Sequence, residues 1–185
     1  AAAVVASADP GAAQFWQQAV SGGTFRAYTS GDVIGVELAG ALKNVVAIAA
    51  GVAWGLGFGA NTVAAIMTRG LAEISRLGIA LGAEASTFQG LAGIGDLSAT
   101  CFSPLSRNRQ LGELLAAGYS ITEAQRSIGQ AVEGRATAPV AVVLARRAHV
   151  EMPIAEHVTA LLEGSESVIE AMGALLERPL TAEGQ

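Results

Sequence analysis

Lys43 is the residue in this sequence best placed to do proton chemistry. It lies in the run 35–46, between apolar helical segments, and the next charged residue along the chain is Arg69. A cation in apolar surroundings is costly unless it is paired or used. A lysine withdrawn from water also loses its proton more easily, which suits it to proton transfer. The simpler interpretation is that Lys43 only pairs with Glu37 or Asp96, or extends its ammonium group to the surface.

Two further patches add a carboxylate and an arginine. Asp96 follows the glycine-rich run 90–95, whose backbone can turn tightly, and it could orient Lys43 or serve as an ordinary turn or helix-cap aspartate. Arg107 stands in the run Ser106–Arg109, which the pattern places in the first turn of a helix. A helix N-terminus offers free N–H groups, and arginine offers a fork that fits phosphate or carboxylate. These residues together suggest an anionic substrate and proton chemistry, although Arg107 alone could be a solvated surface residue.

Other reactive residue types give weaker patterns. Ser106 and Thr100 could add hydroxyl contacts, although helix capping explains both more simply. Cys101 has no activating base near it in sequence and is expected to be a small buried thiol. His149 and His157 have no further histidine or cysteine clustered near them, so the sequence predicts no metal site.

Length, composition and charge exclude several classes of protein. The chain has 185 residues, of which 51% are hydrophobic and 15% charged, so we expect it to fold rather than stay disordered. The net charge of −5 argues against a broad nucleic-acid surface, and any anion site must be a local positive pocket. One cysteine cannot form an internal disulfide, which fits a reducing compartment such as the cytoplasm.

The apolar stretch 44–68 is long enough to span a bilayer. It contains four closely spaced glycines, Gly51, Gly55, Gly57 and Gly59. These glycines predict two buried helices joined by a glycine-rich break. We therefore expect no integral membrane segment.

The first thirty residues predict a strand over 1–7, a helix over 8–20 and a strand over 24–29. Such a unit belongs in a parallel sheet, and one unit alone cannot cover both faces of its strands. The chain also begins without an initiator methionine. We therefore expect residues 1–30 to be the end of a larger α/β domain, and residues 31–185 to form a separate all-helical domain.

Beyond residue 30, helical periodicity dominates and two-residue alternation is weak. Asp32 is the expected N-cap of the first long helix, and Asn61 and Thr62 those of the second. Ser103 and Pro104 predict the start of a later helix. The expected helices span residues 33–53, 63–77, 83–89, 104–117, 122–127, 138–148, 154–164 and 165–176, with a glycine-rich turn over 90–95 and Pro179 after the last helix.

Six ordered runs of sequence form a set. They are DVIGVEL (32–38), GALKNV (40–45), TRGLAE (68–73), GLAGIGDL (90–97), SRNR (106–109) and VEG (132–134). Together they resemble the NAD(P)-dependent glycerol-3-phosphate dehydrogenase family, and its bacterial biosynthetic branch most closely. The resemblance spans most of the chain and is least diagnostic toward the C-terminus.

The resemblance implies a role for each candidate residue. Lys43 is similar to the family's catalytic lysine, which exchanges a proton with the C2 oxygen of the substrate during hydride transfer, and Asp96 is similar to its catalytic carboxylate partner. Arg107 is similar to the ligand of the substrate phosphate. The implied substrate contacts are Lys43, Asn44, Asp96, Thr100, Ser106, Arg107 and Asn108. The implied contacts to the cofactor, NAD or NADP, are Arg107, Val132 and Glu133.

The resemblance also implies an activity and an architecture. The enzyme would interconvert dihydroxyacetone phosphate and sn-glycerol 3-phosphate for glycerophospholipid synthesis, as a cytoplasmic homodimer. The fold would be mainly α: the multi-helical C-terminal substrate domain of a two-domain enzyme like 6-phosphogluconate dehydrogenase, preceded by a β-α-β remnant of a Rossmann domain. Because the glycine-rich cofactor loop of the family is absent, we expect this chain alone to bind no cofactor and to be inactive.

Two other functions stay open on the residues alone. A related two-domain dehydrogenase, such as a ketopantoate reductase-like enzyme, would share the lysine but act on a carboxylate. The run Ser106–Asn108 suits phosphate better, although arginine binds both anions. A helical dimerisation module without chemistry would explain the apolar helices. Loss of function on replacing Lys43 with methionine would separate an enzyme from such a module.

Overall fold

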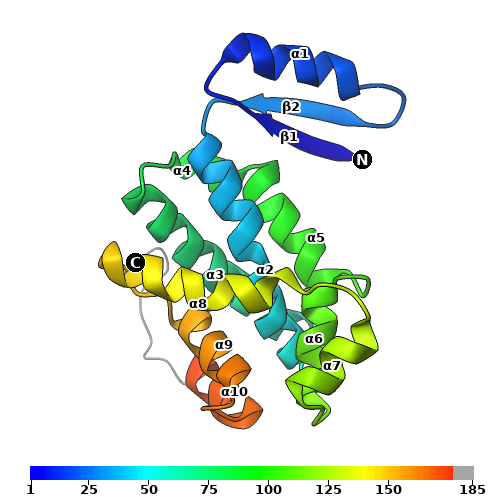
Figure 1. Ribbon diagram of the computed structural model, residues 1–185, viewed down its shortest axis with the longest axis vertical. Coiled ribbons are helices and arrows are strands. Elements are labelled where there is room, and N and C mark those ends of the chain that lie inside the picture. Colours follow the sequence, from blue (N-terminus) through cyan, green and yellow to red (C-terminus); the bar gives the residue numbers. More distant parts are fainter. Residues whose placement is uncertain (177–185) are drawn as a thin grey trace.

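The computed structural model describes residues 1–176, and it is mainly helical with one small parallel sheet (Figure 1). In chain order the elements are β1 (Ala2–Ala6), α1 (Pro10–Val20), β2 (Arg26–Ser30), α2 (Val33–Gly55), α3 (Ala60–Ala80), α4 (Ala85–Gln89), the π-helical turn η1 (Leu91–Gly95), α5 (Asp96–Phe102), α6 (Arg107–Ala116), α7 (Ile121–Ile128), α8 (Glu133–Arg147), α9 (Pro153–Glu163) and α10 (Val168–Leu176). The predicted fold class is confirmed. Pro179, the expected end signal of the last helix, lies outside the described residues.

The N-terminal unit is the predicted strand–helix–strand arrangement. β1 and β2 pair in parallel, from Ala2 opposite Arg26 to Ala6 opposite Ser30. Asp9 caps α1, because its side chain accepts a hydrogen bond from the backbone N–H of Gly11 at 2.9 Å. α1 covers one face of the strand pair, and the helices that begin with α2 lie on the other side (Figure 1).

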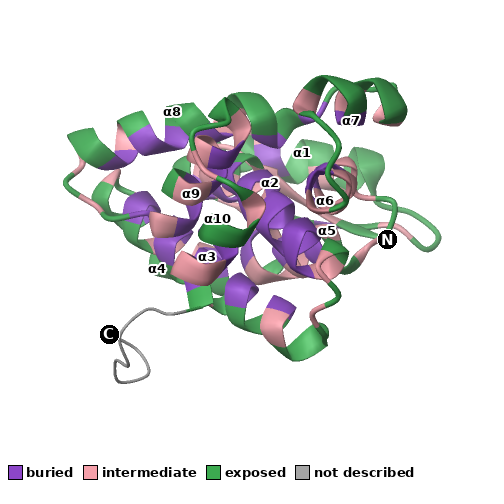
Figure 2. Cartoon of the chain, turned by 90° about the horizontal axis from the view of Figure 1, so that it is seen from below, coloured by how far each residue is buried: buried purple, intermediate pink, exposed green. Residues whose placement is uncertain are grey.

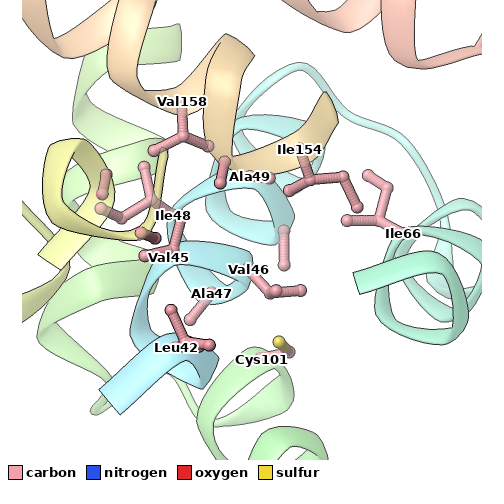
Figure 3. Close-up of a cluster of buried hydrophobic side chains, with 14 of the residues drawn as sticks. Leu42, Val45, Val46, Ala47, Ile48, Ala49, Ile66, Cys101, Ile154 and Val158 are labelled. Carbon is pink, nitrogen blue, oxygen red and sulfur yellow. The ribbon is translucent and has the colours of Figure 1, made fainter. Parts of the chain in front are cut away.

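α2 is the central helix, and α3, α5, α6, α8 and α9 all pack against it. Every α2 residue from 44 to 53 is buried, as the purple core of Figure 2 shows. Its side chains lie among Ile66 of α3, Cys101 of α5 and Val158 of α9 (Figure 3). A helical segment that is apolar on all sides must be kept from water, either inside a protein core or in a membrane. Each buried valine or isoleucine here contributes about 1.5–3 kcal/mol of transfer free energy.

By length and composition alone, α2 could cross a membrane. In the structure, however, 56% of its most apolar window is buried inside the protein. The apolar stretch 44–68 forms two helices joined by a break at residues 56–59, as predicted. Its apolar character is therefore accounted for by burial in the protein core.

α2 and α6 touch through their backbones, because glycines remove side chains from the crossing. A Cβ added to Gly51 would lie 2.1 Å from the carbonyl oxygen of Arg109. A Cβ added to Gly112 would lie 2.2 Å from the carbonyl oxygen of Ile48. α6 begins at Arg107, so this close contact fixes the position of Arg107 along α2.

The predicted starts of α3 and α8 are wrong. α3 begins after Gly59, an acceptable N-cap, and the predicted caps Asn61 and Thr62 lie in its first turn. α8 begins at Glu133 rather than at residue 138. The sequence pattern misleads here because Pro139 is typical of a first helical turn, but it lies in the second turn and leaves one intrahelical hydrogen bond unmade.

The segment between Gly90 and Ser106 departs furthest from the prediction. The sequence predicts a turn over 90–95, whereas the structure forms η1 and runs directly into α5, a helix that the prediction lacks. Ser103 and Pro104 do not start a helix but lie in the turn that precedes α6. Ser106 is the N-cap instead, and its hydroxyl accepts from the backbone N–H of Arg109 at 3.3 Å.

Candidate active site

Lys43 and Asp96 form an ion pair between α2 and the first residue of α5, with Nζ donating to Oδ2. Their side chains are 20% and 41% exposed, so a ligand can reach the pair. Lys43 is the only lysine in the chain, and the ten other basic residues are arginines. Arginine stays charged, whereas lysine can release a proton. A purely structural ion pair could use arginine equally well, so a lysine at this position favours proton transfer.

The π-helical turn η1 positions Asp96. A Cβ added to Gly93 would lie 2.0 Å from the carbonyl oxygen of Phe88, so only glycine lets the end of α4 pack against η1. Phe88 is 1% exposed and lies against Gly78 of α3, where a Cβ would be 2.2 Å from the phenyl ring. Thr100 donates to the carbonyl oxygen of Asp96 at 2.6 Å, so its hydroxyl supports the first turn of α5. π-Helical turns frequently occur at functional sites.

A cavity of about 390 Å³ opens beside Asp96, between β1, α2 and η1. Val4 of β1 and Leu91 of η1 give it apolar walls. Gly40 lies three residues before Lys43 on α2, and a Cβ added there would meet nothing within 4 Å. The missing side chain at this glycine therefore keeps the cavity open next to the ion pair.

Buried amide side chains join α2, α6 and α8. Asn108 Nδ2 donates to Asn44 Oδ1 at 2.8 Å, and its Oδ1 accepts from the backbone N–H of Gly134 at 2.9 Å. Asn44 Nδ2 donates to Glu133 Oε2 at 3.1 Å. Val132, the N-cap residue of α8, is buried. Both asparagines bind other parts of the protein through their side chains, so their predicted contact with the substrate stays a prediction.

Arg107 is the first residue of α6, and its Nη1 donates to Gln130 Oε1 at 3.3 Å. Sequence reasoning missed Gln130 because it lies in an unpatterned loop, 23 residues away. The backbone N–H groups of Arg107 and Asn108 have no acceptor within the helix. Ser106 accepts from the N–H of Arg109, and its hydroxyl proton remains available to a further partner. The start of α6 therefore presents several hydrogen-bond donors of the kind that an anion would need.

Two ionisable groups on the helices that carry Lys43 and Asp96, Cys101 in α5 and the N-cap Asp32 of α2, have displaced pKa values. Burial raises the pKa of the Cys101 thiol to about 12, so this cysteine is the inert buried thiol that the sequence predicts. Burial alone would also raise the pKa of Asp32. Three hydrogen bonds outweigh burial and hold that pKa below its ordinary value: from the Thr87 hydroxyl at 2.6 Å and from the N–H groups of Gly35 at 2.8 Å and Glu84 at 2.9 Å. Asp32 thus caps α2, as predicted, and ties its start to α4.

Comparisons with known proteins identify relatives over most of the chain. Residues 32–173 match a family model described as the C-terminus of NAD-dependent glycerol-3-phosphate dehydrogenase. The glycerol-3-phosphate dehydrogenase (NAD(P)+) of Ruthia magnifica subsp. Calyptogena magnifica is 48% identical, over 98% of this chain and 56% of its own length. The enzyme of the same name from Moorella thermoacetica is 50% identical, over 97% of this chain and 54% of its own length.

A solved structure is similar as well. The crystal structure of glycerol-3-phosphate dehydrogenase from Coxiella burnetii matches with a TM-score of 0.93 and 40% sequence identity, over 96% of this chain and 55% of its own. The chain spans about half the length of the curated relatives that it matches.

Proposed function

Since this chain belongs to the NAD-dependent glycerol-3-phosphate dehydrogenase family, we propose that it supplies the substrate-binding part of an oxidoreductase that interconverts dihydroxyacetone phosphate and sn-glycerol 3-phosphate. The observation that carries the proposal is the Lys43–Asp96 pair, which borders an open cavity and is separated by one short helix from the anion-binding start of α6. The relatives favour neither a ketopantoate reductase-like enzyme nor a dimerisation module.

Lys43 is the proposed general acid in the reducing direction. As C2 of dihydroxyacetone phosphate gains a hydride, the C2=O π bond breaks and the carbonyl oxygen takes a proton from Nζ. The lysine is then neutral until it regains a proton from solvent. Asp96 accepts a hydrogen bond from Nζ and so keeps the ammonium group in place. Acid–base catalysis of this kind typically contributes 10²–10⁴-fold in rate.

The start of α6 is the proposed binding site for the substrate phosphate. Arg107 would exchange its hydrogen bond to Gln130 for a two-pronged contact with the phosphate. The Ser106 hydroxyl and the free N–H groups of the first turn would add to it. The phosphate takes no part in the chemistry, so its binding energy orients C2 toward the lysine. Asn44, Asn108 and Thr100 complete the proposed substrate contacts.

NAD or NADP, when bound, supplies or accepts the hydride. The cavity beside Asp96 fits a flat ring, because Gly40 leaves it open and Val4 and Leu91 give it apolar walls. We propose that Arg107, Val132 and Glu133 hold the cofactor. Glu133 at the start of α8 is exposed while its carboxylate binds Asn44, so it can contact a ligand without losing its anchor.

We further propose that residues 1–30 belong to the cofactor-binding domain and residues 31–185 to the substrate-binding domain. The parallel pair of β1 and β2 is the kind of unit from which a Rossmann sheet is built. The 185 residues alone are then expected to bind no cofactor and to be inactive. The whole enzyme would be a cytoplasmic homodimer that supplies the glycerol backbone of phospholipids.

The test measures NAD(P)H oxidation by dihydroxyacetone phosphate in a polypeptide that joins these residues to a cofactor-binding domain. Lys43→Arg and Lys43→Met are compared with wild type. Arginine preserves the charge and the pairing with Asp96 but cannot release a proton. We therefore expect both variants to lose about 10²–10⁴-fold in kcat while their far-UV circular dichroism stays unchanged.

Three outcomes separate the hypotheses. Normal turnover by Lys43→Arg would show that the lysine is only a structural partner of Asp96. An inactive, folded wild type would refute the proposed substrate, and ketopantoate would be tried next. A folded wild type that is inactive with both substrates would indicate a module without chemistry.

A further inference from the structure

Two side chains from other helices hold the C-terminal end of α5. Trp54 of α2 donates from Nε1 to the carbonyl oxygen of Cys101 at 3.3 Å. Arg109 of α6 donates from Nη1 to the carbonyl oxygen of Phe102. These carbonyls are the last two of α5, and neither has a donor within the helix. A cation is also favourable at this negative end of the helix dipole.

Arg109 contacts three helices at once. Its Nε donates to Glu113 Oε1 within α6 at 2.7 Å, while its guanidinium group lies 4.8 Å from the centre of the Trp54 ring on α2. The side chain is only 15% exposed, and the backbone carbonyl of the same residue contacts Gly51 of α2. This clamp of Arg109 and Trp54 therefore joins α2, α5 and α6.

The clamp lies between the two halves of the proposed site, which are the Lys43–Asp96 pair and the start of α6 at Arg107. α5 has seven residues, with Asp96 at one end and Phe102 at the other, so it is a rod of about 10 Å. The turn after Phe102 leads directly to Arg107 on α6. A change in the angle between α5 and α6 would therefore change the distance from the Lys43–Asp96 pair to the anion-binding start of α6.

We propose that Arg109, supported by Trp54, is a positioning residue that sets this distance and so selects a substrate whose phosphate lies one carbon from the reacting carbonyl. The proposal rests on the proposed function. Dihydroxyacetone phosphate needs both halves of the site, whereas unphosphorylated dihydroxyacetone needs only the Lys43–Asp96 half. Loosening the clamp must therefore penalise the phosphorylated substrate selectively, since misplacing a reacting group by about 1 Å can cost 10²-fold in rate.

The experiment measures kcat/KM for dihydroxyacetone phosphate and for dihydroxyacetone in the polypeptide that includes a cofactor-binding domain. For Arg109→Met we expect a loss of about 10–100-fold with the phosphorylated substrate and of less than about threefold with the other. Trp54→Phe retains an aromatic ring but loses the donor to Cys101, so we expect a smaller loss in the same direction. Arg109→Lys retains a cation at the end of α5 and should recover part of the preference for phosphate.

The matched control is Gln110→Met. Gln110 follows Arg109 on α6, and its side chain donates to the Pro104 carbonyl oxygen in the turn before that helix, so the variant removes a hydrogen bond without touching α5. It should leave the ratio of the two kcat/KM values within about twofold of wild type, since no contact between α5 and α6 is lost. Equal losses with both substrates, or none, would overturn the positioning role. If Arg109→Met does not fold, the ratios for Arg109→Lys and Trp54→Phe decide. A wild type that turns over neither substrate would refute the proposed function instead.

Discussion

We expect Gly51→Ala to destabilise the protein and Gly40→Ala to stabilise it, although both glycines lie on α2. A Cβ at position 51 would be 2.1 Å from the carbonyl oxygen of Arg109, whereas real Cβ contacts are essentially never shorter than 3.0 Å. α6 would have to retreat by roughly 1 Å, because a backbone carbonyl cannot rotate away as a side chain can. At position 40 the added Cβ would meet nothing within 4 Å.

The magnitudes follow from two opposing effects. Replacing a helical glycine by alanine gains about 0.5–1 kcal/mol in both variants. Overpacking costs about 1–3 kcal/mol, and only Gly51→Ala incurs it. The difference leaves Gly51→Ala with a net loss of about 1 kcal/mol at the middle of these ranges and of up to about 2.5 kcal/mol, which lowers Tm by about 2–4 °C at the middle and by up to about 10 °C for a chain of this size. Gly40→Ala should raise Tm by about 1–4 °C.

Thermal and urea unfolding of the 185-residue chain, followed by far-UV circular dichroism, would measure both effects. A Gly51→Ala variant that melts at or above wild type would refute the close backbone contact between α2 and α6. A Gly40→Ala variant that melts lower would refute the open space. In an active enzyme, Gly40→Ala should also lower turnover, because its methyl group would enter the cavity beside Asp96.

Three further predictions concern single residues. Asp32→Asn should cost about 1–2 kcal/mol near neutral pH. The folded-state pKa of Asp32 is lowered, so the stability that its carboxylate contributes is present above the unfolded-state pKa and is lost as pH falls through the folded-state pKa. In urea denaturation, the difference in free energy of unfolding between wild type and Asp32→Asn should therefore shrink below about pH 4. His149 has a positive φ of 55° at the end of α8, so His149→Gly should raise the free energy of unfolding by about 0.5–1 kcal/mol, and an unchanged urea midpoint would contradict this strain. Cys101, with its pKa raised to about 12 and no exposed surface, should resist a thiol reagent in the folded chain and react once urea unfolds it; rapid labelling of the native protein would refute its burial.

The sequence predicts those features of the fold that depend on local pattern. The strand–helix–strand unit and the long helix after Asp32 follow from hydrophobic periodicity and capping, and the structure contains both. Local pattern fails at α5, because its stability comes from outside the segment. The clamp of Arg109 and Trp54 holds one end, and packing of Phe88 against Gly93 positions the turn at the other.

The contacts of the candidate site likewise divide into those that the sequence could predict and those that it could not. The pairing of Lys43 with Asp96 could be predicted, because a lone lysine and a carboxylate after a glycine run are unusual by composition alone. The hydrogen bonds from Asn44 to Glu133, from Asn108 to Asn44 and from Arg107 to Gln130 could not, because each of these three joins residues at least 23 positions apart and none of the local sequences requires a partner. The catalytic and binding roles of these residues stay predictions until activity is measured.

The burial of α2 has a consequence during protein synthesis. α2 is complete at Gly55, but α9, which covers part of it, begins only at Pro153. At a translation rate of about 5–20 residues per second, roughly 5–20 s separate the completed α2 from the start of α9. Until α9 is made, the part of the apolar α2 surface that α9 covers lacks that cover. The core around the helix that carries Lys43 can therefore close only after most of the chain has been synthesised.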